Sequence, residues 1–194
     1  MAWHKQHKEQ SKDKILTSAA DLFTRYGFDK VSINQVMENA NLTRGAFYSH
    51  FTSKSELYAQ AIVKAGELAS NGHINHCDSS LLAIIKRYLS NDHRDEAIKH
   101  LCPLAFLISD INQQNKTVKD TYTHVFKRFV ENIKQQTNHE LLALQAATYM
   151  IGGLALSKAI NDSTLSDELL IACQEGVEDL LNDNNNAITN AKSD

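Results

Sequence analysis

A single proline, Pro103, and seven glycines are the main interruptions to regular structure that these 194 residues contain. Proline breaks helices and central strands, and glycine weakens both and marks turns. Their scarcity favours long helices over a turn-rich sheet fold. Apolar residues also recur at helical spacing, for example in "ILTSAADLFTRY" at residues 15–26. The sequence therefore predicts an all-α protein of about nine helices.

The cysteines and the apolar runs exclude several classes of protein. Cys77, Cys102 and Cys173 are odd in number and widely spaced, which indicates a reducing compartment and neither a disulfide framework nor a zinc site. The start of the sequence has no charge-flanked apolar segment, so it predicts no signal peptide. No apolar run reaches the roughly 18 residues of a membrane span. We expect a cytoplasmic protein without membrane contact, metal or cofactor.

Charge is distributed unevenly along the chain. Residues 1–56 carry eight Lys and Arg against six Asp and Glu, whereas the remainder carries twelve against seventeen. A slightly basic N-terminal head on an acidic body permits a phosphate partner, although the asymmetry is too mild to establish one.

Two short helices follow each other closely in the head. Ser32 and Gln35 have the spacing of a capping box, which predicts a helix over 33–39. After the turn "NANL", Thr43 can cap a two-turn helix that ends near His50. Ser53 and Glu56 form a second capping-box pattern that opens a helix over 53–70. Two short helices joined in this way predict a helix-turn-helix.

The second short helix carries the chemistry of a DNA reader. Phe47 turns inward and leaves polar side chains outside, at Arg44, Gly45, Tyr48, Ser49 and His50. Two helical turns are about 10 Å long, and the major groove is about 12 Å wide. Arginine can read guanine bidentately, while Tyr, His and a nearby lysine such as Lys54 can bind phosphates. Taken singly, a Tyr or His on a short helix is more often a packing residue.

The assembled pattern resembles the DNA-binding domain of the TetR family of bacterial transcriptional regulators. The resemblance covers the first third of the chain, in the stretch from Ala19 to Phe28, the capped helix at Ser32 and the run from Gly45 to Leu57. It implies a three-helix DNA-binding domain over 1–56, a connecting helix over 53–70 and a ligand-binding and dimerisation domain over 71–182. The polar composition of the last residues separately predicts a disordered tail over 183–194. The resemblance also implies this set of DNA-binding residues: Ser32, Thr43, Arg44, Gly45, Tyr48, Ser49, His50 and Lys54. Ser49 departs from the aromatic residue that many relatives carry.

The body is predicted to contain the dimer surface. The segment 141–160 is apolar nearly all round and needs burial on several sides. A homodimer through helices 139–160 and 166–182 supplies that burial, helped by close approach at Gly152 and Gly153. The alternative is a monomer that buries this segment internally. Two copies would place their reading helices about 34–36 Å apart, which predicts a pseudo-palindromic operator in double-stranded DNA.

A pocket for a small hydrophobic effector is the next expectation. Aromatic residues on converging helices suit such a pocket, although an aromatic stripe is more often plain core. The candidates are Tyr88, Cys102, Phe106, Tyr122, Phe126 and Tyr149. Cys102 precedes Pro103 near Lys99 and His100, so it is a candidate sensor of oxidants or electrophiles, the alternative being a buried, inert thiol. The stretch "HRD…CPLA" also resembles one branch of the family.

The sequence thus predicts a homodimeric regulator, a repressor that a ligand releases from its operator. The alternative is an architectural or division-control DNA-binding factor with the same fold and no effector. An enzyme is disfavoured because the chain shows no nucleophile–base pair, metal-ligand spacing or phosphate-cradling glycine loop. His93 between Asp92 and Asp95 could look catalytic, but we interpret it as part of a solvated charged turn.

Overall fold

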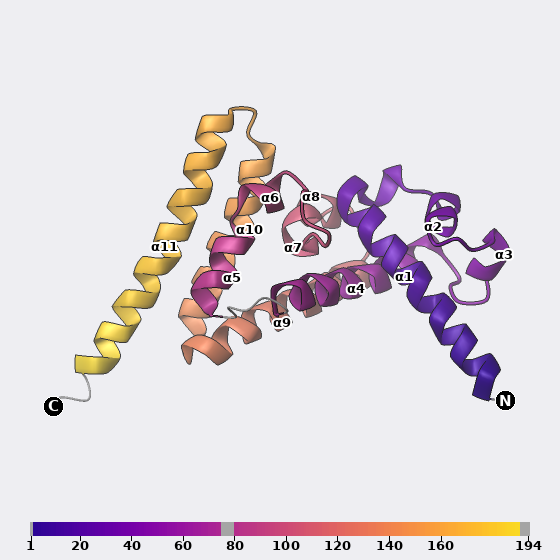
Figure 1. Ribbon diagram of the computed structural model, residues 1–194, viewed down its shortest axis with the longest axis horizontal. Helices are drawn as coiled ribbons and strands as arrows, with labels where there is room; N and C mark the ends of the chain where they lie inside the picture. Colours follow the sequence, from indigo (N-terminus) through magenta and orange to yellow (C-terminus); the bar gives the residue numbers. More distant parts are fainter. Residues whose placement is uncertain (1, 75–79, 191–194) are drawn as a thin grey trace. The chain divides into compact units, whose positions relative to one another are not determined.

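The computed structural model describes residues 2–74 and 80–190, and every regular element in those ranges is a helix, which confirms the all-α prediction. The helices are α1 (Ala2–Lys30), α2 (Ile33–Asn39), α3 (Arg44–Phe47), α4 (Lys54–Ile74), α5 (Leu81–Tyr88), α6 (Asn91–Arg94), α7 (Pro103–Phe106), α8 (Ile108–Ile111), α9 (Lys116–Thr137), α10 (Glu140–Ala159) and α11 (Ser163–Asn190) (Figure 1). These eleven exceed the predicted nine or so, since single-turn helices such as α7 and α8 divide one apolar segment.

The chain forms two compact units that do not follow a single cut in the sequence. The first comprises Met1–Gly72 with His100–Val125, and the second comprises His73–Lys99 with Phe126–Asp194. The first unit therefore holds the predicted head together with α7, α8 and the start of α9. The domain boundaries proposed from the sequence, 1–56 and 71–182, stay predictions.

The core of the first unit is built from one face of α1, the inner sides of α2 and α3, and the start of α4. Its fully buried apolar side chains include Ile15, Phe23, Val36, Phe47, Leu57 and Ile62. The first helix extends well beyond residues 15–26, where the sequence shows helical spacing, but its regular backbone is broken at Gly27, which has a φ of +80°. That left-handed conformation strains any residue with a side chain, so glycine ends the regular helix here.

The second unit centres on the antiparallel pair α10 and α11, which lie side by side (Figure 1). A Cβ atom added to Gly153 would meet Cys173 Sγ at 2.6 Å, so this glycine permits close contact between α10 and α11 of one chain. Nothing lies within 4 Å of a Cβ added to Gly152. The close approach predicted for both glycines at a dimer surface is thus, at Gly153, a contact inside the protomer.

His93 corrects the interpretation of "NDHRDE" as a solvated turn. The side chain of His93 is fully buried, with Nδ1 2.9 Å from the Tyr88 carbonyl oxygen and its ring edge-on to the Tyr88 ring at 5.0 Å. Ser90 caps the short helix by accepting from the His93 N–H at 3.2 Å. The imidazole therefore lies in the interior, whereas the charged residues next to it in the sequence lie at the surface.

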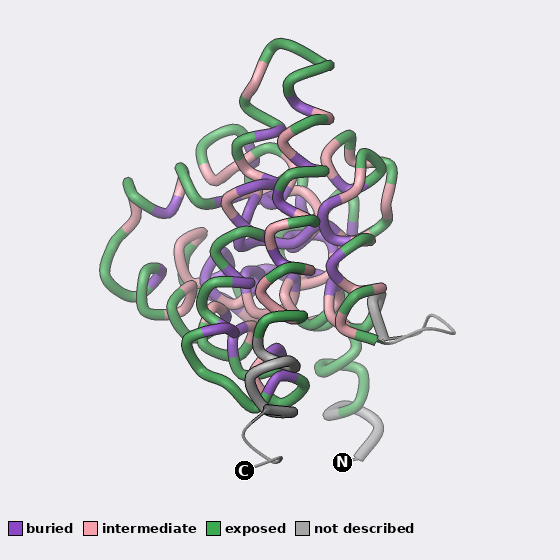
Figure 2. Tube along the Cα trace, turned by 90° about the vertical axis from the view of Figure 1, so that its left-hand side faces the viewer, coloured by how far each residue is buried: buried purple, intermediate pink, exposed green. Residues whose placement is uncertain are grey.

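Helix α10 contrasts one buried side with one exposed apolar side. Figure 2 shows buried residues in the interior and exposed residues on the outer turns. Within the described ranges, α10 is the one helix long and apolar enough to cross a membrane by length and composition, a test that the core helix of a globular protein also passes.

Helix α11 continues to Asn190, beyond the predicted start of a disordered tail at 183, because no glycine or proline follows Gly176.

Candidate nucleic-acid interface

The first short helix of the head starts as the sequence predicts. Ser32 Oγ accepts from the Gln35 N–H at 3.2 Å, and Gln35 Oε1 accepts from the Ser32 N–H at 2.8 Å. Both partners of the capping box are therefore present. Ser32 itself is exposed, so its hydroxyl lies at the surface of the head.

A tight turn then leads into α3. Asn41 adopts a φ of +54°, and the Leu42 N–H donates to the Met37 carbonyl at 2.9 Å. Thr43 occupies the N-cap position in an extended conformation, but its side chain makes no capping hydrogen bond. Its hydroxyl is thus an exposed group beside α3, and the predicted cap at Thr43 rests on backbone conformation alone.

Helix α3 is a single turn fixed by two aromatic side chains. Phe47 is fully buried and its ring lies 5.7 Å from that of Phe51, which is also buried. The turn continues through residue 50, where the His50 and Phe51 N–H groups both donate to the Phe47 carbonyl. The regular helix is shorter than the predicted 43–50, because the chain then turns toward α4.

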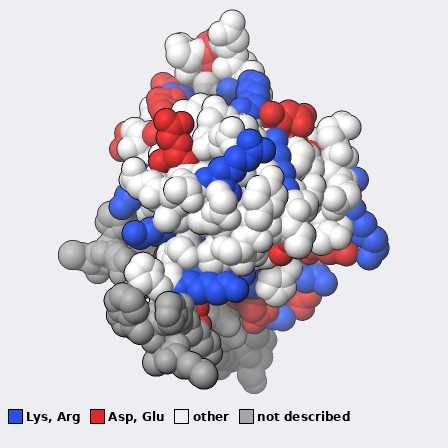
Figure 3. Space-filling view, turned by 90° about the vertical axis from the view of Figure 1, so that its right-hand side faces the viewer, with Lys and Arg blue, Asp and Glu red and all other residues white. Residues whose placement is uncertain are grey.

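The outward side of α3 carries the predicted reading residues. Arg44, Gly45, Tyr48 and Ser49 are exposed, and the Tyr48 side chain is 61% exposed although its ring contacts that of Phe47. A large aromatic side chain left in water on a rigid turn is available for a partner. Figure 3 looks onto the side of the molecule that carries this head and shows Lys and Arg side chains spread across the face.

His50 occupies a different position from its neighbours on α3. It is half-buried, and its Nε2 atom lies 2.8 Å from Ser11 Oγ on α1. Burial, followed by the charges of Lys8 and Lys12, lowers the pKa of His50. The ring nitrogen predicted to reach phosphates therefore binds α1 in this structure.

Lys54 lies at the start of α4 with its ammonium group held over a ring. Its Nζ atom is 4.2 Å from the centre of the Phe28 ring, a cation–π geometry. Burial lowers the pKa of Lys54, and the carboxylates of Asp29 and Asp110 act in the opposite direction. A phosphate contact by Lys54 stays a prediction.

The second predicted capping box, at Ser53 and Glu56, forms only in part. Ser53 Oγ accepts from the Glu56 N–H at 3.1 Å, as expected at an N-cap. The Glu56 carboxylate reaches one residue further back, where it accepts from the Thr52 N–H at 2.8 Å and the Thr52 hydroxyl at 2.7 Å. These hydrogen bonds lower the pKa of Glu56 and fix the entry into α4.

Asp110 on α8 joins this site, although no motif in the sequence predicts it. The Tyr58 hydroxyl on α4 donates to Asp110 Oδ2, and the Phe28 N–H, after Gly27, donates to Oδ1 at 3.4 Å. Burial and the Asp110 hydrogen bond raise the pKa of Tyr58. One carboxylate therefore ties the end of α1 and the first turns of α4 to a segment 82 residues away from Phe28.

The predicted pocket residues fall into both compact units. Cys102, Phe106 and Tyr122 belong to the first, in which Cys102 is buried and the Tyr122 hydroxyl donates to the Leu104 carbonyl at 2.5 Å. Tyr88 and Phe126 belong to the second, as does Tyr149, which is 43% exposed on α10. A shared pocket stays a prediction. The buried Cys102 thiol favours the inert alternative over an exposed sensor.

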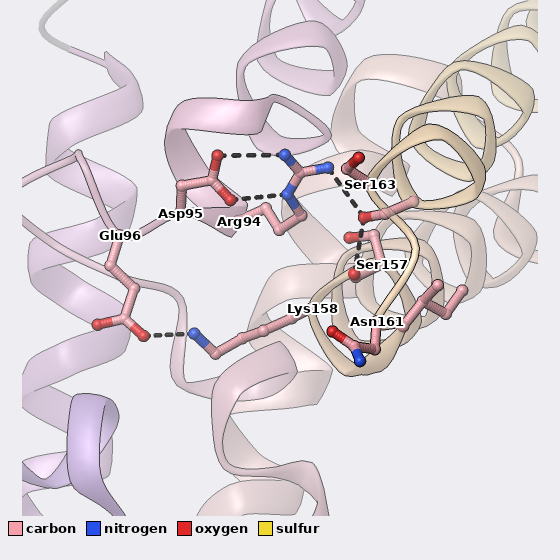
Figure 4. A pocket seen from close by; sticks show the side chains of 9 residues that line it. Arg94, Asp95, Glu96, Ser157, Lys158, Asn161 and Ser163 are labelled. Atoms are coloured by element: carbon pink, nitrogen blue, oxygen red, sulfur yellow. Dashed lines mark hydrogen bonds and ion pairs between the residues drawn. The ribbon is translucent and has the colours of Figure 1, made fainter.

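Described residues of the second unit line at least two hollows. One, of about 550 Å³, is mainly apolar and is lined by Leu144, Gln145, Thr148, Tyr149, Gly152, Gly153, Leu156 and Cys173. The other, of about 650 Å³, is polar and surrounds Arg94 (Figure 4). Within the described residues, no group of three or more His, Cys, Asp or Glu side chains could hold a metal ion.

Arg94 is the centre of the polar hollow. Its guanidinium group donates to both oxygens of Asp95 at 2.7 and 3.1 Å, to Asp167 Oδ1 at 2.5 Å and to Ser166 Oγ at 2.8 Å. Hydrogen bonds with Asp95 and Asp167 raise the pKa of Arg94. Because its guanidinium group donates to neighbouring carboxylates, Arg94 links α6 to the start of α11.

Comparison with known proteins shows what the head is similar to. Residues 15–61 match the model of "Bacterial regulatory proteins, tetR family". An uncharacterized HTH-type transcriptional regulator of Lactococcus lactis is 28% identical over 167 residues, covering 78% of this chain and 85% of that protein. The biofilm operon negative regulator IcaR of Staphylococcus aureus is 33% identical over 51 residues, covering 26% of this chain and 27% of that protein.

Solved structures confirm the fold over most of the chain. A TetR transcriptional regulator from Chloroflexus aurantiacus superposes with a TM-score of 0.67 at 18% identity, covering 89% of this chain and 96% of that one. A TetR-family regulator from Cytophaga hutchinsonii gives 0.67 at 17% identity, covering 90% and 94%. The resemblance found in the head is therefore confirmed over residues 15–61, and the solved structures show that most of the chain shares their fold.

Proposed function

We propose that this TetR-family helix-turn-helix regulator is a homodimeric repressor that binds a pseudo-palindromic operator in the cytoplasm and leaves it when a small hydrophobic effector binds. The observation that carries the DNA-binding role is α3, whose buried Phe47 presents Arg44, Gly45, Tyr48 and Ser49 outward on one rigid turn. The sign of regulation is supported by IcaR, whose name describes a negative transcriptional regulator.

Each exposed group of the site has a separate role in the proposed complex. Arg44 reads a guanine edge or grips a phosphate, because its planar fork can pair with either. Gly45 lets the DNA backbone approach closely, since it carries no side chain. Tyr48 and the hydroxyls of Ser32 and Thr43 donate to phosphates, which positions α3 in the major groove without specifying sequence.

The second copy is proposed to cover the outer face of α10 and α11. Leu141, Leu144, Tyr149 and Leu156 on α10 are each at least 39% exposed, and Ile171 on α11 is 53% exposed. Isologous pairing of such a face buries it in both copies at once. The same pairing sets the separation of the two α3 turns, which has to match one turn of DNA, about 34–36 Å.

Effector release is proposed to act through α4. Its first turns hold Lys54 over Phe28, and Tyr58 is bonded to Asp110 on α8 in the same compact unit. A ligand that binds more tightly to a form with a shifted α7–α8 segment would move α4 through Asp110 and change the α3 separation. An effector shifts the equilibrium only by its difference in affinity for the two forms.

Selection of bound sites from a random DNA pool tests the proposal as a whole. We expect an inverted repeat whose half-site centres lie about one helical turn apart, bound by two copies of the chain. Recovery of sequences without common half-sites would overturn specific operator binding. A site that two copies bind, but that no compound in an effector screen releases, would support the architectural alternative.

A further inference from the structure

The first half of α1 precedes the region that matches the family, which begins at residue 15. This segment contains "KQHKEQSKDK", residues 5–14, in which four lysines stand against one Glu and one Asp. One of those acids is already engaged, because Asp13 Oδ1 lies 2.5 Å from the Lys64 ammonium group on α4. The segment is thus a cationic extension of α1 that the known domain does not include.

This extension is anchored beside the turn that follows α3. Ser11 Oγ lies 2.8 Å from His50 Nε2, and the Lys12 ammonium group lies 5.6 Å from the centre of the Phe51 ring. Lys8 and Lys12 lie close enough to His50 for their charges to act on its ring. Contacts with two consecutive residues of the α3–α4 turn therefore fix the direction of the extension.

On the proposed function as a DNA-binding regulator, we infer that Lys8 and Lys12 form a second phosphate-binding segment, which the Ser11–His50 hydrogen bond positions beside α3. The two lysines are four residues apart and project from one face of α1, about 6 Å from each other along the axis. Phosphates along one DNA strand follow each other at about 3.4 Å of axial rise. Because lysine carries its ammonium group on a long flexible stem, two lysines at this spacing can each reach a phosphate of the same strand. His50 acts as a positioning residue for α1.

Salt titration of DNA binding separates this role from general attraction. Full-length protein and a DNA site selected as above are titrated between about 50 and 200 mM salt, where each phosphate contact contributes about 0.9 to the slope of log K against log salt. Lys8→Gln and Lys12→Gln should each reduce the slope by about 1 per protomer and weaken binding to all sequences alike. The arginine variants at both positions should retain the slope, because arginine also binds phosphate.

Lys14→Gln is the matched control. Lys14 is exposed on the same helix and loses the same charge, but it lies two residues from Lys12 and so projects from another side of α1. We expect its slope to stay near that of the wild type. Ser11→Ala should lose part of the contribution of the two lysines while the melting temperature falls by no more than about 4 °C, since the half-buried Ser11 loses only hydrogen bonds of its side chain, such as that to His50.

The outcomes distinguish the two proposals. A Lys8→Gln/Lys12→Gln double variant with the same slope and affinity as Lys14→Gln would overturn the phosphate-binding segment, while operator binding by the wild type would leave the proposed function intact. Wild-type protein that binds no selected DNA would instead overturn the proposed function. A reduced slope that is restored by the arginine variants supports the inference.

Discussion

Helices α3 and α10 both leave one side uncovered, but the uncovered side chains differ in kind. Helix α3 has four residues and exposes Arg44 and, at its C-cap, Tyr48, whereas α10 has 20 residues and exposes leucines such as Leu144 and Leu156. Polar and cationic groups on a rigid turn suit a phosphate partner that stays hydrated. Apolar groups on a long helix suit a partner that removes them from water.

The difference lies in what holds each surface in place. The single turn of α3 has little stability of its own, so Phe47 and Phe51 must fix it to the core. Helix α10 is held by its whole inner side, which includes Ala146, Ala147 and Met150. A change under α3 should therefore remove both stability and DNA binding, whereas a change on either outer face should impair binding and leave the stability of the protomer nearly unchanged.

The largest effect is expected from Phe47→Ala. The ring is fully buried, and such truncations cost about 3–5 kcal/mol because they remove apolar contacts and leave a cavity. The free energy of unfolding, measured by urea denaturation, should fall by that amount together with DNA binding. Tyr48→Ala is the matched control: its exposed ring predicts a stability change within about 0.5 kcal/mol. Equal destabilisation by both variants would contradict the inward and outward division of α3.

Leu144→Glu is the corresponding change on α10. A charge placed in the proposed dimer surface should shift the protein to a monomer in analytical ultracentrifugation. Operator affinity should then fall by about 10²–10⁴-fold, since the two half-sites are no longer bound together. Ile108→Glu on α8 is the control, because Ile108 is 42% exposed against 39% for Leu144. A variant that stays dimeric would place the interface elsewhere.

Much of the head could be predicted because its signals are local. The capping box from Ser32 to Gln35 spans four residues, and the inward position of Phe47 follows from helical spacing. Contacts between distant segments could not be predicted in the same way. The bond from Tyr58 to Asp110 depends on how α8 folds back onto the head, and no spacing in the sequence records it.

The body was predictable in composition but not in detail. Its apolar helices were evident, yet the burial of His93 was missed because its charged neighbours made the segment read as a solvated turn. The role of Gly153 was also misassigned, because a glycine that permits close packing does not reveal whether the neighbouring helix belongs to the same chain. The burial of His93 and the neighbour of Gly153 both depend on which segments the fold brings together, and sequence spacing does not show this.

Arg44→Ala should affect DNA binding without affecting the fold. Arg44 is exposed on α3, so the free energy of unfolding should stay within about 0.5 kcal/mol of the wild type. Operator affinity should fall by about 1–3 kcal/mol, and repeated site selection should show relaxed preference at one base pair of each half-site if Arg44 reads a base. An equal loss on every sequence would instead assign Arg44 to a phosphate.

Tyr48→Phe should give the smallest effect and tests the outer face of α3 most finely. The variant keeps the ring contact with Phe47 and removes only the exposed hydroxyl, so the fold should be unchanged. Because water can replace the exposed hydroxyl at the phosphate, loss of this one hydrogen bond should weaken binding by only about 0.5–1.5 kcal/mol. The measurement is a gel-shift titration on operator and on scrambled DNA. A phosphate contact requires the same loss on both, whereas a loss confined to the operator would show that Tyr48 reads a base and that α3 lies deeper in the groove.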